Sequence, residues 1–439
     1  MDAKDRRIAE LETLLRTALE RITELERRLG LNSRNSSKPP SSDGYKKPSP
    51  KSLRCAGQRR SGGQIGHAGK TLGQTETPDW IVEHHVKSCN RCQKDLEAAT
   101  PSRYVCRQVF DIPEPKIEVT EHRAEVKICD CGCVNTGLFP KEVNAPVQYG
   151  KRVMALAVYL SVQQMIPEDR LQIAFMDIFG LTISTATLVR FNEIFAKKIS
   201  SEVDQKLEVL KKASVKHVDE TGIRIAGKLH WLHVICSDQL THYRISEKRG
   251  DLLEDLEGII SHDHWKPYFT LENVTHSLCN AHHLRALKAL EEDSESWAFE
   301  MSAFLKNSAH HSKSPPPNFM AEAYEKYDDI VSKGLAFHEA LPPFPKPARG
   351  RQKRRPGHNL LLRFQNFKDD VLRFLTDPSI PFTNNQAEQD IRMMKVKQKI
   401  SGSFRTLLGA QIFCTIRSFL SSSRKQNLNL FVSIKFALT

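Results

Sequence analysis

Three acidic residues have the types and positions that could bind a divalent cation. Asp219 lies within a predicted strand in HVDET, Asp263 follows another predicted strand in SHDHW, and Glu388 opens a predicted helix in NNQAEQD. They are far apart in the sequence. They could still meet in space, because the strand that carries Asp219 is expected to be the central strand of an α/β sheet, and a helix can pack against it. Three carboxylates gathered in a basic chain are costly unless a cation neutralises them. The three acids therefore predict a site for Mg²⁺ or Mn²⁺.

The chemistry of such a site is cleavage or transfer of a phosphodiester. Two Mg²⁺ ions held by a few carboxylates can activate a water or a 3′-hydroxyl and stabilise the leaving oxygen. Beyond Glu388, the predicted helix carries cations at i+4, i+7 and i+11, on the same side as the acid. We predict that cations of this region contact a DNA backbone, namely Arg392, Lys395, Lys397, Lys399 and Arg405. An exposed helix with simple Glu–Arg pairing is the plainer interpretation.

A second metal site is predicted from the cysteines. Cys89 and Cys92 have the spacing of a zinc knuckle, and Cys129, Cys131 and Cys133 form an irregular C-x-C-x-C group. Four thiolates from two such turns can hold a structural Zn²⁺ and stabilise a small module. We predict ligation by Cys89, Cys92, Cys129 and Cys131, with Cys133 as the alternative. Unliganded thiols are the plainer interpretation.

Length and charge limit the possible partners. The chain has 439 residues, enough for two to four domains, and a formal net charge of +13. Such a charge favours a polyanionic partner or an anionic membrane surface. Neither a run of about 18 apolar residues nor a signal-peptide pattern is present. We therefore expect a cytoplasmic, nucleoid-associated protein with no membrane partner, in which free or metal-bound thiols are more common than disulfides.

The N-terminal part is predicted to be a zipper followed by a basic linker. Residues 1–30 carry a heptad seam of apolar residues, consisting of Ile8, Leu11, Leu15, Ala18, Ile22, Leu25 and Leu29. The seam predicts a coiled coil and at least a homodimer, or else an amphipathic helix packed on its own domain. Residues 31–78 are rich in Ser, Pro and Gly, and their cations predict a flexible segment that follows phosphates or serves as a simple tether.

Two modules are predicted between the linker and the acids. Residues 79–148 alternate like short strands around the cysteines, which predicts the zinc-binding β module. Residues 149–210 are helical, with a break at Gly180 and a new start at a Ser/Thr cap. This is a helix-turn-helix outline, in which Thr185–Asn192 either reads DNA or simply packs.

The remaining residues are predicted to form a split core. Residues 211–300 begin with three antiparallel strands, VKHVDETGIRI, LHWLHVICSD and THYRISEK. We expect a helix over DLLEDLEGI, a fourth strand in GIISHDHW and a helix from Ala281 to Glu292, which together indicate a mixed sheet. Residues 301–380 are predicted to be a helical insertion, and residues 381–439 to complete the core with helices over 385–399 and 408–423. The fold class is thus multidomain α+β and α/β.

Several segments together resemble the insertion-sequence-66-type transposases, a DDE group with an RNase-H-like core. They include NSSKPPSSDG, FPKEVNAPVQYG, HVDETGIRI, SHDHWKPYF, CNAHHLRAL and, most specifically, NNQAEQDIRMMKVKQKISGSFRT. The resemblance implies that Asp219, Asp263 and Glu388 form the catalytic triad, and that a zinc module and a helix-turn-helix precede an RNase-H-like core interrupted by the insertion. It also implies binding of terminal inverted repeats and target DNA, Mg²⁺-dependent strand cleavage and transfer, and possible accessory transposition proteins.

The resemblance leaves other interpretations open. Cys279 and His282 match a C-x-x-H signature of several DDE transposases, and we expect structural packing there because no second ligand pair is evident. His262, His264 and His283 are interpreted as packing residues or phosphate contacts. A catalytically inactive DNA-binding regulator or relic, and a structure-selective RNase-H-like nuclease, are the alternative functions.

Overall fold

The structure is a computed structural model that describes residues 3–32, 34–36, 69, 71–313, 316–344, 350 and 352–439. The basic linker predicted at 31–78 lies mostly outside these residues. The chain divides into two compact units, one of Met1–Tyr45 with Val119–Thr439 and the other of Lys46–Glu118. Each unit is described by itself.

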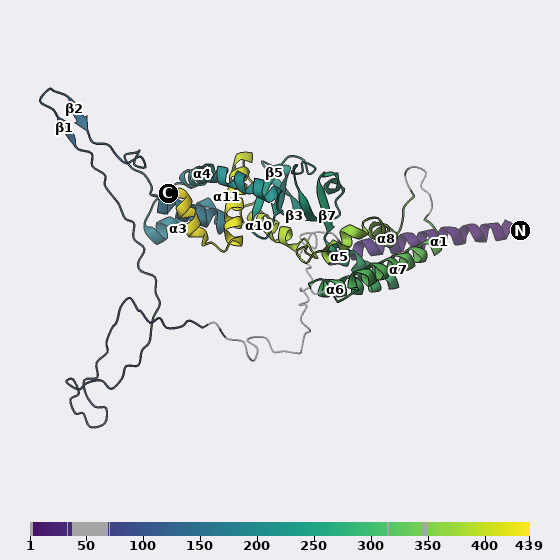
Figure 1. Ribbon diagram of the computed structural model, residues 1–439, viewed down its shortest axis with the longest axis horizontal. Coiled ribbons are helices and arrows are strands. Elements are labelled where there is room, and N and C mark those ends of the chain that lie inside the picture. Colours follow the sequence, from purple (N-terminus) through teal and green to yellow (C-terminus); the bar gives the residue numbers. More distant parts are fainter. Residues whose placement is uncertain are drawn as a thin grey trace. The chain divides into compact units, whose positions relative to one another are not determined.

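The larger unit contains a five-stranded mixed sheet with the strand order β5-β4-β3-β6-β7 (Figure 1). The strands are β3 (Val215–Ile225), β4 (Lys228–Cys236), β5 (Thr241–Ser246), β6 (Gly258–His262) and β7 (Val274–Leu278). The first three are antiparallel, and β6 and β7 run parallel to β3. Ala226 and Gly227 close the first hairpin with φ of 48° and 79°, because a two-residue turn needs left-handed backbone. The mixed sheet and its central first strand are confirmed.

The helix expected over DLLEDLEGI is wrong. Between β5 and β6 the chain is irregular until Gly258, where β6 begins. Asp255 and Gly258 have φ of 60° and 75°, and a Cβ at Gly258 would lie 2.8 Å from the Ser214 carbonyl oxygen. Left-handed residues interrupt a helix, and the leucines of this segment pack against Ile260 and Tyr268 without one. The same apolar spacing that indicates a helix therefore serves here to cover one side of the sheet.

Helices on the other side of the sheet form the main core. They are α2 (Lys151–Val158), η2 (Tyr159–Gln163), α3 (Glu168–Phe179), α4 (Thr185–Lys211), α10 (Asn385–Ser401), α11 (Leu407–Lys425) and α12 (Leu430–Leu438). Leu232 and Tyr243 of the sheet share a cluster with Met394 of α10 and with Phe413 and Phe419 of α11. The helices expected over 385–399 and 408–423 are confirmed. The sheet thus presents β3 to α10, the helix that carries Glu388.

The helix pair of α3 and α4 contains the predicted turn. Gly180 ends α3 with φ of 62°, and the Ser184 side chain caps α4 by accepting a hydrogen bond from the backbone N–H of Thr187. Within Thr185–Asn192, buried positions alternate with exposed ones; Leu188, Phe191 and Asn192 are buried, and Thr185, Ala186, Val189 and Arg190 are exposed. Reading of DNA by the exposed side chains stays a prediction.

A second core lies in the helical segment that connects β7 to α10. Its helices are α5 (Asn280–Glu292), α6 (Ser296–His311), α7 (Phe319–Ala340), α8 (Pro356–Asn366) and α9 (Lys368–Leu372), with the short 3₁₀ helices η3 (Lys266–Thr270) and η4 (Arg373–Leu375) nearby. Trp297, Tyr327 and Phe364 are among its buried residues. The helical character expected for 301–380 is confirmed in the described residues. The first turns of α5 extend from the end of β7 toward α10.

The described segments before α2 are a long helix and a region with little regular structure. Helix α1 (Ala3–Gly30) leaves apolar seam residues exposed, with Leu15 at 62% and Ile22 at 51%. Within the described part of 79–148, the regular structure is the hairpin of β1 (Val126–Ile128) and β2 (Val134–Thr136). The coiled coil and the zinc module stay predictions. No described helix is long and apolar enough to cross a membrane.

A buried ion pair fastens α10 to α11 and β5, which predicts a large stability effect. Lys425 Nζ lies 2.8 Å from Asp390 Oδ2, the side chains are 11% and 14% exposed, and the Thr241 hydroxyl donates to the same oxygen. Asp390→Ala should lower the free energy of unfolding by about 3 kcal/mol, because it leaves a buried ammonium unpaired. Urea unfolding checks this. Glu202→Ala, which removes the more exposed Lys206–Glu202 pair, should cost under about 1 kcal/mol. Equal losses would contradict the assignment.

Candidate active site

The sheet aligns two of the three predicted acids. Asp219 lies in the middle of the central strand β3, opposite Val234 of β4. Asp263 follows directly after β6, the parallel neighbour of β3. The register pairs His217 with Ser261, and continuing it by two residues brings Asp219 level with Asp263. Adjacent strands lie about 4.8 Å apart, so these two side chains start from neighbouring backbone positions.

The third acid comes to the same place on α10. Glu388 lies in the first turn of that helix. Burial raises the pKa of Asp219 well above its usual range, and the negative charges of Glu220, Asp263 and Glu388 raise it further. Since charges influence a buried carboxyl group only when they are near it, the acids form one electrostatic cluster. Asp263 and Glu388 thus lie within electrostatic range of Asp219, and their role as one metal-binding triad stays a prediction.

Local hydrogen bonds fix the two aspartates. The backbone N–H of Glu220 donates to Asp219 Oδ1 at 2.9 Å, and the backbone N–H of Trp265 donates to Asp263 Oδ1 at 2.9 Å. Each bond holds one oxygen of its carboxylate. Ordered carboxylates of this kind are suited to coordinate a hard cation through oxygen.

Asn384, which the sequence reasoning missed, fastens α10 to the central strand. Its side-chain amide donates to the Val218 carbonyl at 2.7 Å, and its Oδ1 lies 2.9 Å from His217 Nδ1. Its backbone N–H donates to Cys279 Sγ at 3.0 Å. Asn384 is 2% exposed and immediately precedes α10. It therefore helps to determine where Glu388 lies relative to Asp219, and the pair of asparagines at the start of the helix is the sequence signal that points to it.

Comparison with known protein families identifies the family of the chain. Residues 146–412 match the Transposase IS66 family, a range that includes all three acids. The chain belongs to the IS66 family of transposases. Residues 2–72 match a second family, which is described as one of unknown function. No curated protein matches the sequence significantly.

The transposase carries a further buried acid beside Asp219 that the sequence reasoning did not single out. Glu220 Oε1 accepts a hydrogen bond from Arg249 Nε at 2.9 Å, and Tyr268 donates its hydroxyl to Oε2. The Arg249 guanidinium lies over the Trp265 ring at 4.1 Å. Burial raises the pKa of Glu220, while Tyr268 and Arg249 oppose the rise. Because Arg249 and Tyr268 occupy both of its oxygens, Glu220 is less available as a metal ligand than Asp263 or Glu388.

The predicted DNA-contacting cations of the transposase have different surroundings. Lys395 Nζ donates to the Gly222 carbonyl at 3.0 Å, and burial lowers the pKa of this ammonium. Lys397 Nζ lies 3.2 Å from Ser401 Oγ. Exposed cations of the set are Arg392, Lys399 and Arg405. The last three are therefore the better placed for a DNA backbone.

The predicted zinc ligands of the transposase fall into both compact units. Cys89 and Cys92 belong to Lys46–Glu118, whereas Cys129, Cys131 and Cys133 belong to the larger unit. A hydrogen bond from the Cys92 backbone lowers the pKa of Cys89, and one from the Cys131 backbone lowers that of Cys129. Turns that stabilise a thiolate in this way are typical of zinc knuckles. Zinc binding by these residues stays a prediction.

The remaining predicted positions act as packing residues within the described part. His262 Nε2 lies 3.0 Å from His276 Nδ1, and His264 packs edge-on against Phe367. His283 Nδ1 lies 3.0 Å from Asn280 Oδ1 at the start of α5. Burial lowers the pKa of all of them, to about 3 for His262 and about 4 for His264. They are therefore neutral near pH 7.

The raised pKa of Asp219 predicts how the metal-free protein responds to pH. A carboxyl group whose pKa is higher in the folded state contributes stability below its unfolded pKa of about 3.9, and that stability is lost as the pH rises through the folded value. Asp219→Asn should remove this loss. In EDTA at pH 7 we expect a melting temperature about 2–4 °C above wild type for a gain of about 1 kcal/mol. At pH 4 the difference should shrink, and added Mg²⁺ should stabilise wild type only.

Proposed function

We propose that this IS66-family chain is a DNA transposase that binds the ends of its element, cleaves a DNA strand there and transfers it to target DNA. The observation that carries the proposal is the electrostatic cluster of Asp219, Asp263 and Glu388, in a chain with a net charge of +13. The carboxylates are hard oxygen donors, and the raised pKa of Asp219 means that a cation would relieve their repulsion. These residues therefore fit Mg²⁺ or Mn²⁺. Bound there, Mg²⁺ would activate a water or 3′-hydroxyl and stabilise the leaving oxygen.

The sheet and α10 both contribute residues to the proposed site. Asp219 in β3 and Asp263, directly after the neighbouring strand β6, provide two carboxylates. Glu388 at the start of α10 provides the third. Asn384 holds that helix on β3 through Val218 and His217. Exposed Arg392, Lys399 and Arg405 continue along and beyond α10 as contacts for DNA phosphates. In this proposal the core is an RNase-H-like catalytic unit, and the helical segment is inserted in the sequence between Asp263 and Glu388.

The outlying segments supply assembly and recognition in this proposal. The exposed apolar seam of α1 serves as a dimer zipper. The cysteine module, with structural Zn²⁺ on Cys89, Cys92, Cys129 and Cys131 or Cys133, and the exposed start of α4 contact the terminal inverted repeats. Accessory transposition proteins belong to the same proposal.

A strand-transfer assay tests the function. Purified full-length protein is incubated with a supercoiled plasmid that carries candidate element ends, a target plasmid and Mg²⁺. We expect nicks that map to the element ends and joined products that disappear when EDTA is added. Specific binding to the ends without any cutting would favour the inactive regulator. Cutting of RNA–DNA hybrids or junctions regardless of the end sequence would favour the structure-selective nuclease.

A further inference from the structure

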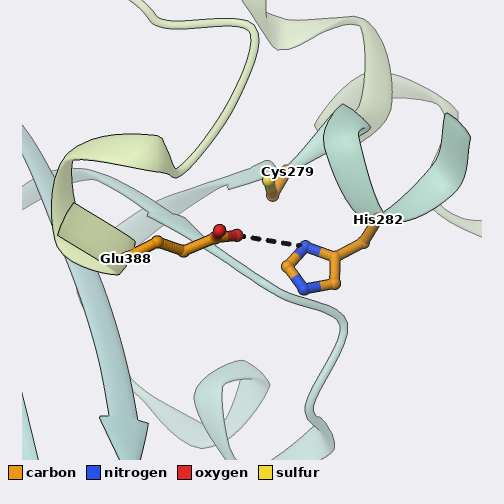
Figure 2. A group of neighbouring side chains, drawn as sticks. All are labelled: Cys279, His282 and Glu388. Carbon is orange, nitrogen blue, oxygen red and sulfur yellow. Dashed lines mark ion pairs between the residues drawn. The ribbon is translucent and has the colours of Figure 1, made fainter. Parts of the chain in front are cut away.

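A second cluster of potential metal ligands lies at the junction of α5 and α10. Cys279 immediately precedes α5, His282 lies in its first turn, and Glu388 lies in the first turn of α10. One donor atom from each of these residues lies within 4.8 Å of the other two (Figure 2). The side chains come from segments about a hundred positions apart, and the bond from the Asn384 N–H to Cys279 Sγ joins those segments. The cluster is thus built by the tertiary structure.

The ligand atoms of these three side chains lie close together but form no hydrogen bonds with one another. His282 Nδ1 is buried and has no hydrogen-bond partner within the described chain. It faces Glu388 Oε1 at 4.0 Å, which is too far for a hydrogen bond (Figure 2). Cys279 is 1% exposed and its sulfur accepts a hydrogen bond, as a thiolate ligand commonly does. Buried polar atoms are normally paired, so an imidazole nitrogen that lies unpaired beside a thiol and a carboxylate is available to bind a cation.

We propose that Cys279, His282 and Glu388 form a binding site for a thiophilic divalent cation of the Zn²⁺ type, separate from the Mg²⁺ carboxylates but sharing Glu388 with them. Sulfur, imidazole and carboxylate donors suit Zn²⁺, whereas Mg²⁺ prefers oxygen alone. Ligand atoms on a tetrahedral Zn²⁺ lie roughly 3.3–3.8 Å apart, so the side chains must close by about 1 Å. The Cys279 thiol loses its proton to solvent on binding.

Because the two proposed metal sites share Glu388, a cation bound at one would affect the other. A carboxylate has two oxygens, so one can bind the thiophilic cation while the other faces Asp219. Three protein ligands also leave a position open for water or a phosphate oxygen. Arg285 Nη2 lies 3.3 Å from Glu388 Oε1, and this partly exposed ion pair competes with the cation for the carboxylate. Cation binding itself requires no strand transfer, although the influence on Glu388 rests on the proposed function.

Cobalt provides the test, because Co²⁺–thiolate bonds absorb in the near ultraviolet. The reduced full-length protein carries serine in place of Cys89, Cys92, Cys129, Cys131 and Cys133, so that the thiols of the predicted zinc module give no Co²⁺ signal. Titration with Co²⁺ should give a thiolate band, and equilibrium dialysis measures the equivalents bound. Adding Cys279→Ser should remove that band and weaken this site at least about 100-fold. His282→Gln should weaken it by about 10-fold or more while keeping the thiolate available.

Matched variants separate ligation from folding. Cys414→Ser replaces another buried cysteine, on α11, and should leave Co²⁺ binding unchanged. Arg285→Gln removes the competing cation and should leave binding equal or tighter. If Cys279→Ser and His282→Gln both bind Co²⁺ as the background protein does, the site does not exist. An inactive protein that shows the Cys279-dependent band keeps this site and loses the proposed function; an active protein without the band does the reverse.

Discussion

Asp219→Asn is expected to lower strand cleavage at least about 10³-fold while binding to the element ends stays within about twofold of wild type. The substitution keeps the size of the side chain but removes a negative charge from the centre of the acid cluster. Loss of metal-dependent charge stabilisation costs several kcal/mol of barrier, and about 4 kcal/mol corresponds to that factor. Single-turnover cleavage of end DNA with Mg²⁺ measures the first quantity, and a binding titration without metal measures the second.

Asp238→Asn is the matched control for this result. Asp238 is an exposed acid in the turn after β4, so the substitution makes the same chemical change away from the cluster. It should leave the cleavage rate within about twofold of wild type. Asp263→Asn and Glu388→Gln should resemble Asp219→Asn. A cleavage-competent Asp219→Asn protein would remove the role that we assign to the cluster.

Asn384→Ala is expected to lower strand cleavage about 10–100-fold, the usual effect of losing a partner that orients a metal ligand. The Asn384 side chain touches none of the three acid side chains nor, in our proposal, the metal; its backbone carbonyl accepts the Glu388 N–H at 3.3 Å, and its side chain joins α10 to β3. Without this joint, Glu388 loses its fixed distance from Asp219. We therefore expect a higher Mg²⁺ concentration for half-maximal activity. A merely structural role would lower the amount of folded protein without moving this concentration.

The neighbouring asparagine supplies the control for Asn384. Asn385 is exposed and is the first residue of α10, so Asn385→Ala changes the same residue type one position away. It should leave both the cleavage rate and the Mg²⁺ requirement nearly unchanged. Equal effects of the two substitutions would show that the joint to β3 does not explain the loss.

The helical segment between the acids has a consequence for how the site is built. Its first helix, α5, and the residue before it supply His282, Arg285 and Cys279 to the neighbourhood of Glu388. The segment therefore contributes directly to the surroundings of the third acid. A change in the packing of α5 should therefore alter the position of Glu388 first, because side chains of α5 contact this residue.

The sequence by itself determined the local elements and the family. The short apolar stretches of Val215–Ile225 and Lys228–Cys236, separated by the turn at Ala226 and Gly227, indicate strands, and the helices around 385–399 and 408–423 follow from helical periodicity. The motifs around Asp219, Asp263 and Glu388 were sufficient to indicate the insertion-sequence-66-type transposases. These signals are local, so they can be interpreted without knowing which segments touch.

Only the tertiary structure decided which segments meet. Periodicity reports which side chains are buried but not the backbone that buries them, so the leucines of 251–259 indicate a helix that left-handed Asp255 and Gly258 prevent. The short strand β7 and the helix α12 have too few residues for a clear period. Asn384, Cys279 and His282 acquire their roles near Glu388 through contacts between segments about a hundred residues apart. Sheet register and helix packing set those contacts, and no pattern within a single element records them.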